Sequence, residues 1–232
     1  MPPLPAPQPG FVFPQKQTLN YAVDWRVFPA GVAAFHIEGD GNVQHVSVEA
    51  DTVGAVNLLF RVTDRFQSSF NSQTGCSQQF AKQIVEGRRH VNSTLQFDYA
   101  DKKAIFTEKN LVSGIKKHVE TPIPPCVTDS LSAIFYAASQ PMTVGKSFQF
   151  PLGDSTRTVK VTMRVEGREQ ITTPAGTFQT LRVEPTADAG VVKSRGNIWI
   201  WYTDDSRRIP VQMRARLFWG TITFRLTSIE PK

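Results

Sequence analysis

Two histidines, His36 and His45, have the side chains and the spacing in this sequence that best suit chemistry. Asp40-Gly41 lies between them and suits the two central positions of a type I′ hairpin turn, which both need positive φ. Such a turn places the two imidazoles directly opposite each other, with Glu38 and Glu49 on the same face. This set could hold a transition metal or divide the roles of acid and base. The alternative is the solvated outer face of an amphipathic hairpin, with no metal.

Arg214, Arg216 and Arg225 form a second candidate site, because they share the polar face of a hairpin predicted to turn at Trp219-Gly220. Guanidinium groups match carboxylates, sulfates and phosphates, so this face favours an anionic glycan or a lipid headgroup as ligand. The alternative is an ordinary solvent-exposed face whose arginines pair with nearby glutamates. Trp199 could stack on a sugar ring, or it packs in the core.

Asp204 and Asp205 are candidates for a paired-carboxylate site of the kind that hydrolyses glycosidic bonds. Adjacent aspartates followed by serine are also typical turn residues. The sequence contains no G-x-S-x-G, H-E-x-x-H, P-loop or G-x-G-x-x-G motif. The sequence therefore favours a binding protein over an enzyme, and we expect no cofactor.

Cys76 and Cys126 are the two cysteines of the chain, and each lies beside turn residues. An even pair of this kind predicts one disulfide, with free buried thiols or a catalytic cysteine as the alternatives. A disulfide implies an oxidising compartment, so we expect an exported protein. Residues 1–16 are rich in proline and predict a linker that follows a removed export signal.

Composition and charge limit the partners. The chain has 26 Lys and Arg against 20 Asp and Glu, a formal net charge of +6, which permits an anionic partner. We expect no nucleic acid, because no helix-turn-helix, zinc-finger or RNP pattern is present. No stretch approaches the roughly 18 apolar residues of a membrane-spanning helix, so no transmembrane segment is expected.

The elements that must position these residues are short alternating strands separated by turns, and they predict one all-β domain over residues 17–232. One short helix is expected at about 130–140, capped by Asp129 or Thr128. Strands joined by short turns predict an antiparallel meander, which forms either a closed barrel or a strongly curved half-barrel sheet around the helix. The strands are expected at 19–25, 32–38, 43–50, 64–70, 78–88, 94–99, 104–108, 156–166, 178–184, 197–202, 209–218 and 221–229.

Several stretches occur in an order and at a spacing that carry a family resemblance. They are Leu19-Asn-Tyr-Ala-Val-Asp-Trp25 with Pro29-Ala-Gly31, Asp129-Ser-Leu-Ser132 with Pro141-Met-Thr-Val-Gly145, Val165-Glu-Gly-Arg-Glu169 with Thr173-Pro-Ala-Gly-Thr-Phe178, and Ile198-Trp-Ile-Trp-Tyr-Thr-Asp-Asp-Ser-Arg-Arg-Ile-Pro-Val211 with Gly220. Together they resemble the bacterial domain-of-unknown-function family 3108. The resemblance implies an exported envelope protein with an all-β architecture and implies no catalytic residues. We therefore expect the protein in the periplasm or outside a bacterial cell, with a tether to the outer membrane as a further option. The two cysteines are not part of the family's pattern.

Three functions are compatible with these observations. The favoured hypothesis is non-enzymatic binding or carriage of an amphipathic or anionic glycan or lipid by a curved sheet. The second is a carbohydrate-active enzyme, a glycoside hydrolase or polysaccharide lyase, that uses carboxylates or the histidine pair. The third is a structural or assembly module without a small ligand. A binding protein needs an apolar concave surface with a few polar groups, whereas an enzyme needs several titratable groups that converge.

Overall fold

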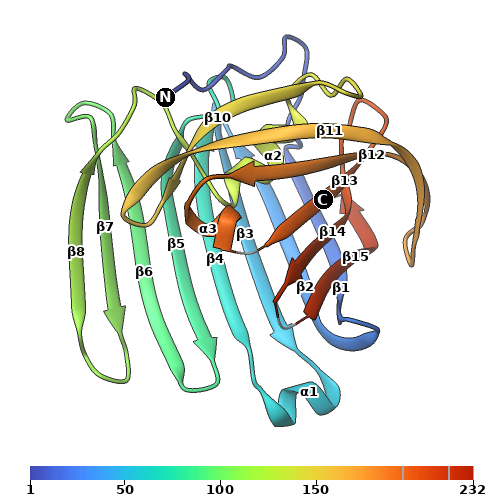
Figure 1. Cartoon of the computed structure of the whole chain (residues 1–232), viewed down its shortest axis with the longest axis horizontal. Coiled ribbons are helices and arrows are strands. Elements are labelled where there is room, and N and C mark those ends of the chain that lie inside the picture. The colour runs from blue at the N-terminus through green and yellow to red at the C-terminus, as the bar shows by residue number, and fades with distance from the viewer. Residues whose placement is uncertain (195, 219, 232) are drawn as a thin grey trace.

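The computed structural model of the chain describes residues 1–194, 196–218 and 220–231, and shows one strongly curled sheet of 15 strands (Figure 1). The strands are β1 (Lys16–Trp25), β2 (Phe28–Asp40), β3 (Val43–Thr52), β4 (Thr63–Asn71), β5 (Ser77–Glu86), β6 (Arg89–Asp98), β7 (Lys103–Asn110), β8 (Lys116–Pro122), β9 (Thr128–Asp129), β10 (Ser147–Asp154), β11 (Arg157–Thr173), β12 (Gly176–Ala187), β13 (Asn197–Thr203), β14 (Pro210–Leu217) and β15 (Gly220–Pro231). The helices are α1 (Gly54–Leu59), α2 (Ser132–Ala138) and α3 (Gly190–Ser194).

The sheet has two arms that meet where β1 pairs with β15. Its order is β8-β7-β6-β5-β4-β3-β2-β1-β15-β14-β13-β12-β11-β10-β9, and every pair is antiparallel except β9 with β10. We call β1–β8 the N-terminal arm and β15–β9 the C-terminal arm. Within the described residues the edge strands β8 and β9 are not hydrogen-bonded to each other, so the sheet is curled but not closed. The predicted all-β meander is confirmed, in its strongly curved form.

Alternation of side chains along each strand separates an inner from an outer face. In the hairpin of β2 and β3, Phe35, Ile37, Val46 and Val48 are buried in the core, and the histidines lie on the outer face. The two faces are those that the sequence predicts. A strand has a side-chain period of two residues, so its apolar set can be buried on one side only.

The predicted pairing of this hairpin is wrong by two residues. Asp40 pairs with Val43, so the central turn residues are Gly41 and Asn42. Of these two, only Gly41 has a positive φ, 57°, which is typical of a type II′ turn with glycine first and not of type I′. His36 consequently faces Ser47, and His45 faces Glu38.

The C-terminal hairpin shows the same shift. Leu217 pairs with Gly220, so Gly220 already belongs to β15 and is not a turn residue as predicted. Trp219, the other residue of the predicted turn, lies outside the described residues. Because the shift is again two residues, the arginines keep the predicted outer face, with Arg214 opposite Thr223 and Arg225 opposite Gln212.

Helix α2 lies inside the curl and is shorter than the predicted 130–140. Its start is held by Asp129, whose Oδ1 accepts the backbone N–H groups of Leu131 (2.8 Å) and Ser132 (3.0 Å), as in a helix N-cap. Most of its side chains are buried in the core. Tyr202 of β13 donates its hydroxyl hydrogen to the carbonyl oxygen of Ile134 at 2.8 Å, which ties the helix to the C-terminal arm.

The proline-rich N-terminal segment packs against α2 and does not extend away from the domain. Leu4 and Phe13 are buried in the core, and the Tyr136 hydroxyl donates to the carbonyl oxygen of Pro5 at 2.8 Å. The backbone N–H of Gln8 donates to the carbonyl oxygen of Ser139 at 3.0 Å. The segment contains no helix or strand before β1, and its apolar side chains complete the core beside α2.

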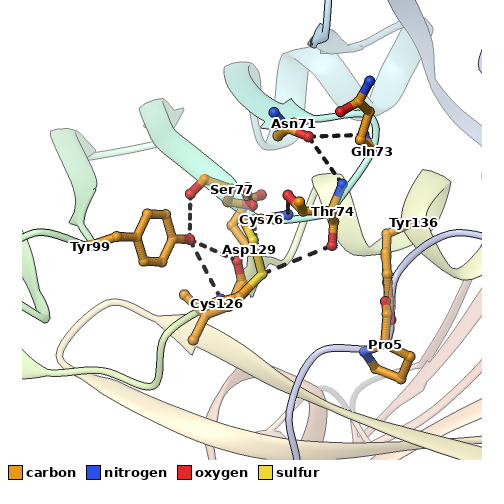
Figure 2. Close-up of a disulfide and its surroundings, with 11 residues drawn as sticks. Pro5, Asn71, Gln73, Thr74, Cys76, Ser77, Tyr99, Cys126, Asp129 and Tyr136 are labelled. Carbon is orange, nitrogen blue, oxygen red and sulfur yellow. Dashed lines mark hydrogen bonds between the residues drawn. A yellow bond between two sulfur atoms is a disulfide. The ribbon is translucent and has the colours of Figure 1, made fainter.

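The two arms are joined at the end of the sheet where α2 lies, which we call the α2 end (Figure 2). The Asp129 Oδ2 atom accepts the hydroxyls of Ser68 in β4 and Ser77 in β5, both at 2.6 Å. Beside this group, Cys76 and Cys126 form the predicted disulfide, with their Cα atoms 5.2 Å apart. Covalent and buried polar contacts therefore hold the curl where ladder hydrogen bonds do not.

We expect the double variant Cys76→Ser, Cys126→Ser to be less stable than the wild type by up to about 4 kcal/mol, because the disulfide closes a loop over a sequence separation of 50 residues. Urea unfolding of both proteins measures this difference. The non-reduced wild type should also be 2 Da lighter than its dithiol form. Equal midpoints of the reduced and oxidised wild type would contradict a stabilising role for the bond.

Candidate functional site

One cross-strand row on the N-terminal arm changes from apolar to polar toward the free edge. Phe66, Lys82, Ser93, Glu108 and Lys117 lie directly opposite one another on β4, β5, β6, β7 and β8. Side chains two positions apart on a strand share a face. Phe66 therefore shares the face of Ser68, whose hydroxyl contacts Ser132 of α2 at 2.6 Å. We call these five residues the inner row.

Both lysines of the inner row cover aromatic rings. The Lys82 Nζ atom lies 5.2 Å from the ring centroid of Phe80, and the Lys117 Nζ atom lies 5.7 Å from that of Phe106. The two rings are buried, whereas Lys82 is half-buried and Lys117 is exposed. This is how lysines place their apolar stems on a hydrophobic surface while the charged group stays near water.

The apolar interior becomes less buried away from α2. At the α2 end, the inward residues Leu19, Phe70 and Phe150 are fully buried. Toward the opposite end, which we call the α1 end, Ile84 and Val91 are buried beside the β5–β6 turn, but other inward hydrophobic side chains on both arms are half-buried; these are Val23, Ala50, Phe66, Ile198 and Phe224. The interior is therefore packed around α2 and opens toward the α1 end.

A carboxyl pair lies on the same face, next to the inner row. Asp64 is buried, and its Oδ1 accepts the backbone N–H of Val85 at 3.0 Å. The pKa of Asp64 is raised to about 6, above all by burial and also by the neighbouring Glu86, while the hydrogen bond from Val85 and the charge of Arg89 lower it. Glu86 itself accepts a hydrogen bond from Arg89 Nη1 at 3.0 Å. Asp64 can therefore hold a proton up to about pH 6.

The outer face of β6–β8 has a shallow groove of about 440 Å³. Two outer rows flank it, Asn92 with Lys109 and Lys116, and Thr94 with Thr107 and His118. Ser93, Glu108 and Lys117 of the inner row also line it. The groove is polar and basic, and it is open to solvent.

The two predicted histidines lie on the outer face and do not converge. His36 Nδ1 is within hydrogen-bonding distance of the Thr18 hydroxyl, at 3.0 Å. His45 is exposed opposite Glu38. Over the described ranges of the chain, no group of three or more His, Cys, Asp and Glu residues is placed to hold a metal ion.

The predicted arginine and tryptophan site also lies on the outer face. The Arg214 guanidinium stacks over the Trp201 ring, 5.4 Å from its centroid, and Trp199 is its half-buried cross-strand neighbour. Arg225 Nε donates to Asp24 Oδ2 at 2.7 Å, while Arg216 is exposed toward the α1 end. The structure brings Trp199 and Arg214 together but separates them from the inner face. Ligand binding by these residues stays a prediction.

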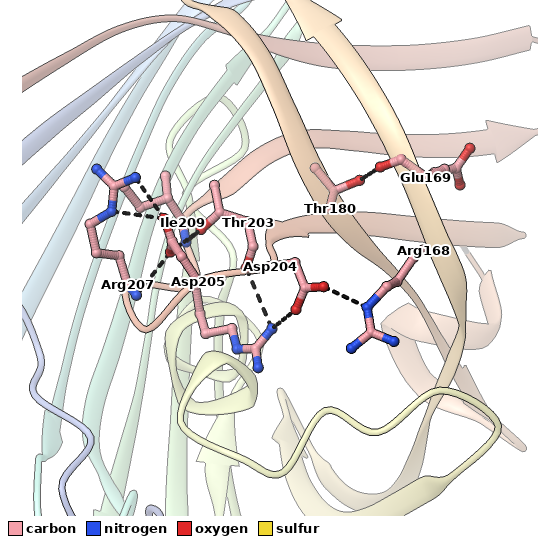
Figure 3. A network of polar contacts seen from close by, with 9 residues as sticks. Arg168, Glu169, Thr180, Thr203, Asp204, Asp205, Arg207 and Ile209 are labelled. Carbon is pink, nitrogen blue, oxygen red and sulfur yellow. Dashed lines mark hydrogen bonds and ion pairs between the residues drawn. The ribbon is translucent and has the colours of Figure 1, made fainter.

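Asp204 and Asp205 lie in the β13–β14 loop and each is paired with arginine (Figure 3). Asp204 accepts hydrogen bonds from Arg168 Nε and Arg208 Nη1, and these, the first above all, hold its pKa below the usual value. Burial works against the ionised form of Asp205, but hydrogen bonds from Arg207 and Thr203 lower its pKa overall. Each carboxylate is thus stabilised in its ionised form, which does not suit a general acid; catalysis by them stays a prediction.

The inner row was missed by the sequence reasoning, although a signal for it exists. Lys82 lies two residues from Phe80 and two from Ile84, so strand alternation alone places this lysine on an apolar face. Lys117 lies on β8, which was not expected as a strand, because Lys116–Pro122 has only one large apolar residue.

The chain forms a curled, barrel-like antiparallel sheet with a largely apolar inner face, which defines its class of β protein. Comparisons with known sequences and structures assign it to a family in this class. The chain belongs to the family described as protein of unknown function (DUF3108), which matches residues 20–227. None of the curated proteins compared matches the sequence.

Three solved structures cover 95% of this chain. The β-barrel-like protein of the domain of unknown function DUF1849 from Brucella abortus has a TM-score of 0.66 at 10% identity and is covered over 99% of its length. A candidate exported protein with a YmcC-like fold from Bacteroides fragilis scores 0.43 at 8% identity, covered over 99%. A candidate lipoprotein from Parabacteroides distasonis scores 0.38 at 12% identity, covered over 98%. The first likeness shows a shared fold.

None of the helices in the described part of the chain is long and apolar enough to span a membrane.

We expect Asp64→Asn to stabilise the protein relative to the wild type at pH 7 but not at pH 4. The pKa of Asp64 is about 6 in the folded state against an ordinary value of 3.8, so its favourable contribution is complete below about pH 4 and is lost as pH rises through about 6. A shift of about two units corresponds to roughly 3 kcal/mol at most. Urea unfolding of both proteins at the two pH values measures the difference, and a difference that is independent of pH would contradict the assignment.

Proposed function

We propose that this protein is an extracytoplasmic binding protein that holds an anionic amphiphile, a lipid or a lipid-linked glycan, on the inner face of its N-terminal arm. The observation that carries the proposal is the inner row, which places two lysines over buried aromatic rings on the inner face of the sheet. The disulfide supports the compartment, because such bonds persist in oxidising environments.

The inner row suits a ligand with an acyl chain and an anionic head. Phe80 and Phe106 offer apolar surface that the lysine stems now cover, and long side chains can rotate away from it. An acyl chain that replaces the stems keeps the rings out of water. The half-buried Lys82 ammonium group then meets the anionic head through a charge-assisted hydrogen bond, and the exposed Lys117 adds a second positive charge at the free edge.

Glu108 makes it possible to test whether the affinity for an anionic ligand rises or falls with the charge of the inner row. It lies between Ser93 and Lys117 in the inner row and is the one acid among the five residues. Because a carboxylate repels an anionic head, its removal should tighten binding, whereas removal of either lysine should weaken it. A role limited to packing would not produce opposite signs.

The test is a fluorescence titration with 11-(dansylamino)undecanoic acid. We expect saturable binding to the wild type, at least tenfold weaker binding to Lys82→Gln, Lys117→Gln, and tighter binding to Glu108→Gln. The matched control Lys146→Gln, Lys160→Gln changes two exposed lysines of the C-terminal arm and should bind within twofold of the wild type. Glutamine keeps most of the stem, so the effect reports charge.

A second probe separates charge from apolar contact. The same dansyl chain ending in an alcohol should bind the wild type at least tenfold more weakly than the acid and should not distinguish the wild type from the lysine variant. No saturable binding of the acid, or equal binding by the wild type and Lys82→Gln, Lys117→Gln, would contradict the proposal.

A further inference from the structure

The α1 end of the sheet collects five chain connections. In an antiparallel meander alternate turns lie at the same end, so the β1–β2 turn, the α1 connection and the β5–β6, β7–β8 and β14–β15 turns all lie there. Figure 1 shows α1 and these turns below the body of the sheet. The five connections are residues 25–28, 53–62, 87–90, 109–117 and 217–221.

These connections hold most of the exposed large hydrophobic side chains. Among the described residues 13 such side chains are more than about a third exposed, and nine of them lie in these 32 positions. Phe218 is 100% exposed and Val27 is 82% exposed, whereas a soluble surface rarely gathers such side chains in one place. The nine are Trp25, Val27, Phe28, Val53, Phe60, Leu111, Val112, Ile115 and Phe218.

The same connections hold the positive charge of the chain. They contain seven Lys and Arg and no Asp or Glu, so the rest of the chain has a net charge of −1 against +6 for the whole. The basic residues are Arg26, Arg61, Arg88, Arg89, Lys109, Lys116 and Lys117. Apolar tips and basic residues therefore alternate along one end of the molecule.

Backbone hydrogen bonds join neighbouring connections, and the α1 connection is joined to β2 beside the β1–β2 turn, where the N–H of Val53 donates to the carbonyl oxygen of Ala30 at 3.0 Å. The backbone N–H of Arg26 donates to the carbonyl oxygen of Thr221 at 2.7 Å, and that of Gly87 donates to the carbonyl oxygen of Arg61 at 2.9 Å. The N–H of Leu111 donates to the carbonyl oxygen of His90 at 2.8 Å. We call this surface, the five connections together, the basic apolar rim.

We propose that the basic apolar rim docks on the surface of an anionic lipid bilayer. The apolar tips would enter the boundary between headgroups and acyl chains, and the Lys and Arg side chains would remain among the anionic headgroups. This inference stands independently of ligand binding by the inner row. If the protein both docks on the bilayer and binds a ligand on the inner row, the less buried end of its interior is turned toward the lipid.

The chemistry of the rim favours a bilayer over a protein partner. Its apolar side chains protrude from four separate connections, and a fluid surface can receive each tip without shape complementarity. Surface-binding segments combine Trp, Phe and Leu with Lys and Arg in this way. Each Lys or Arg near an anionic membrane contributes about fivefold in affinity.

The test is flotation of the full chain with vesicles of phosphatidylethanolamine and phosphatidylglycerol at 3:1, against vesicles of phosphatidylcholine alone. We expect binding to the anionic vesicles at least tenfold tighter than to the neutral ones, and a tenfold or greater loss between 0.1 M and 0.5 M NaCl. Val112→Asp, Ile115→Asp should reduce binding at least tenfold, and Lys109→Gln, Lys116→Gln about 25-fold. None of these residues belongs to the inner row.

The matched control is Val12→Asp, Val144→Asp, which adds the same charges at exposed valines outside the rim and should bind within twofold of the wild type. Equal melting temperatures show that the variants are folded, and unchanged titration with the dansyl acid separates the rim from the inner row. Absence of binding to anionic vesicles, or equal binding by the wild type and Val112→Asp, Ile115→Asp, would overturn the proposal. Self-association in solution that this variant abolishes would reassign the rim to contacts between copies.

Discussion

The buried carboxyl group of Asp129 connects the two arms of the sheet and helix α2. It accepts hydroxyl hydrogen bonds from Ser68 and Ser77 on the N-terminal arm, and backbone hydrogen bonds from the first turn of α2. Asp129 itself belongs to β9, the edge of the C-terminal arm. A polar group fully removed from water needs these partners, and meeting that need brings the two arms together around the helix.

The contacts that join the two arms lie at the α2 end, and they affect how the interior is packed at the α1 end. Near α2, the disulfide, the Asp129 contacts and Phe97 against Gly153 pack β5 and β6 onto the short β9–β10 edge; a Cβ atom at Gly153 would lie 2.6 Å from the Phe97 ring. Away from α2 the arms diverge, and inward side chains on both are half-buried. Strands β6–β8 extend beyond the closure, with an exposed hairpin at their end.

This asymmetry relates the two proposals. The inner row lies on the arm that extends past the closure, and the basic apolar rim borders the end that the closure leaves less buried. On the outer face of the C-terminal arm, Arg182 is paired with Glu166 at 2.7 Å, and Arg225 is paired with Asp24 of β1 at 2.7 Å. Because the residues outside the rim have a net charge of −1, the net positive charge of the chain lies at the rim.

The sequence by itself determined the all-β class, the short helix, the cysteine pair and the inner and outer faces of the hairpins, because strand alternation is unchanged by a pairing shift of two residues. For the same reason, the alternation pattern did not reveal the pairing shift that places His36 opposite Ser47 and His45 opposite Glu38. Only the tertiary structure decided that β1 pairs with β15, that Lys82 covers Phe80 inside the curl, and that five distant turns form one rim. Such arrangements depend on which segments meet in space, and local residue patterns do not encode that.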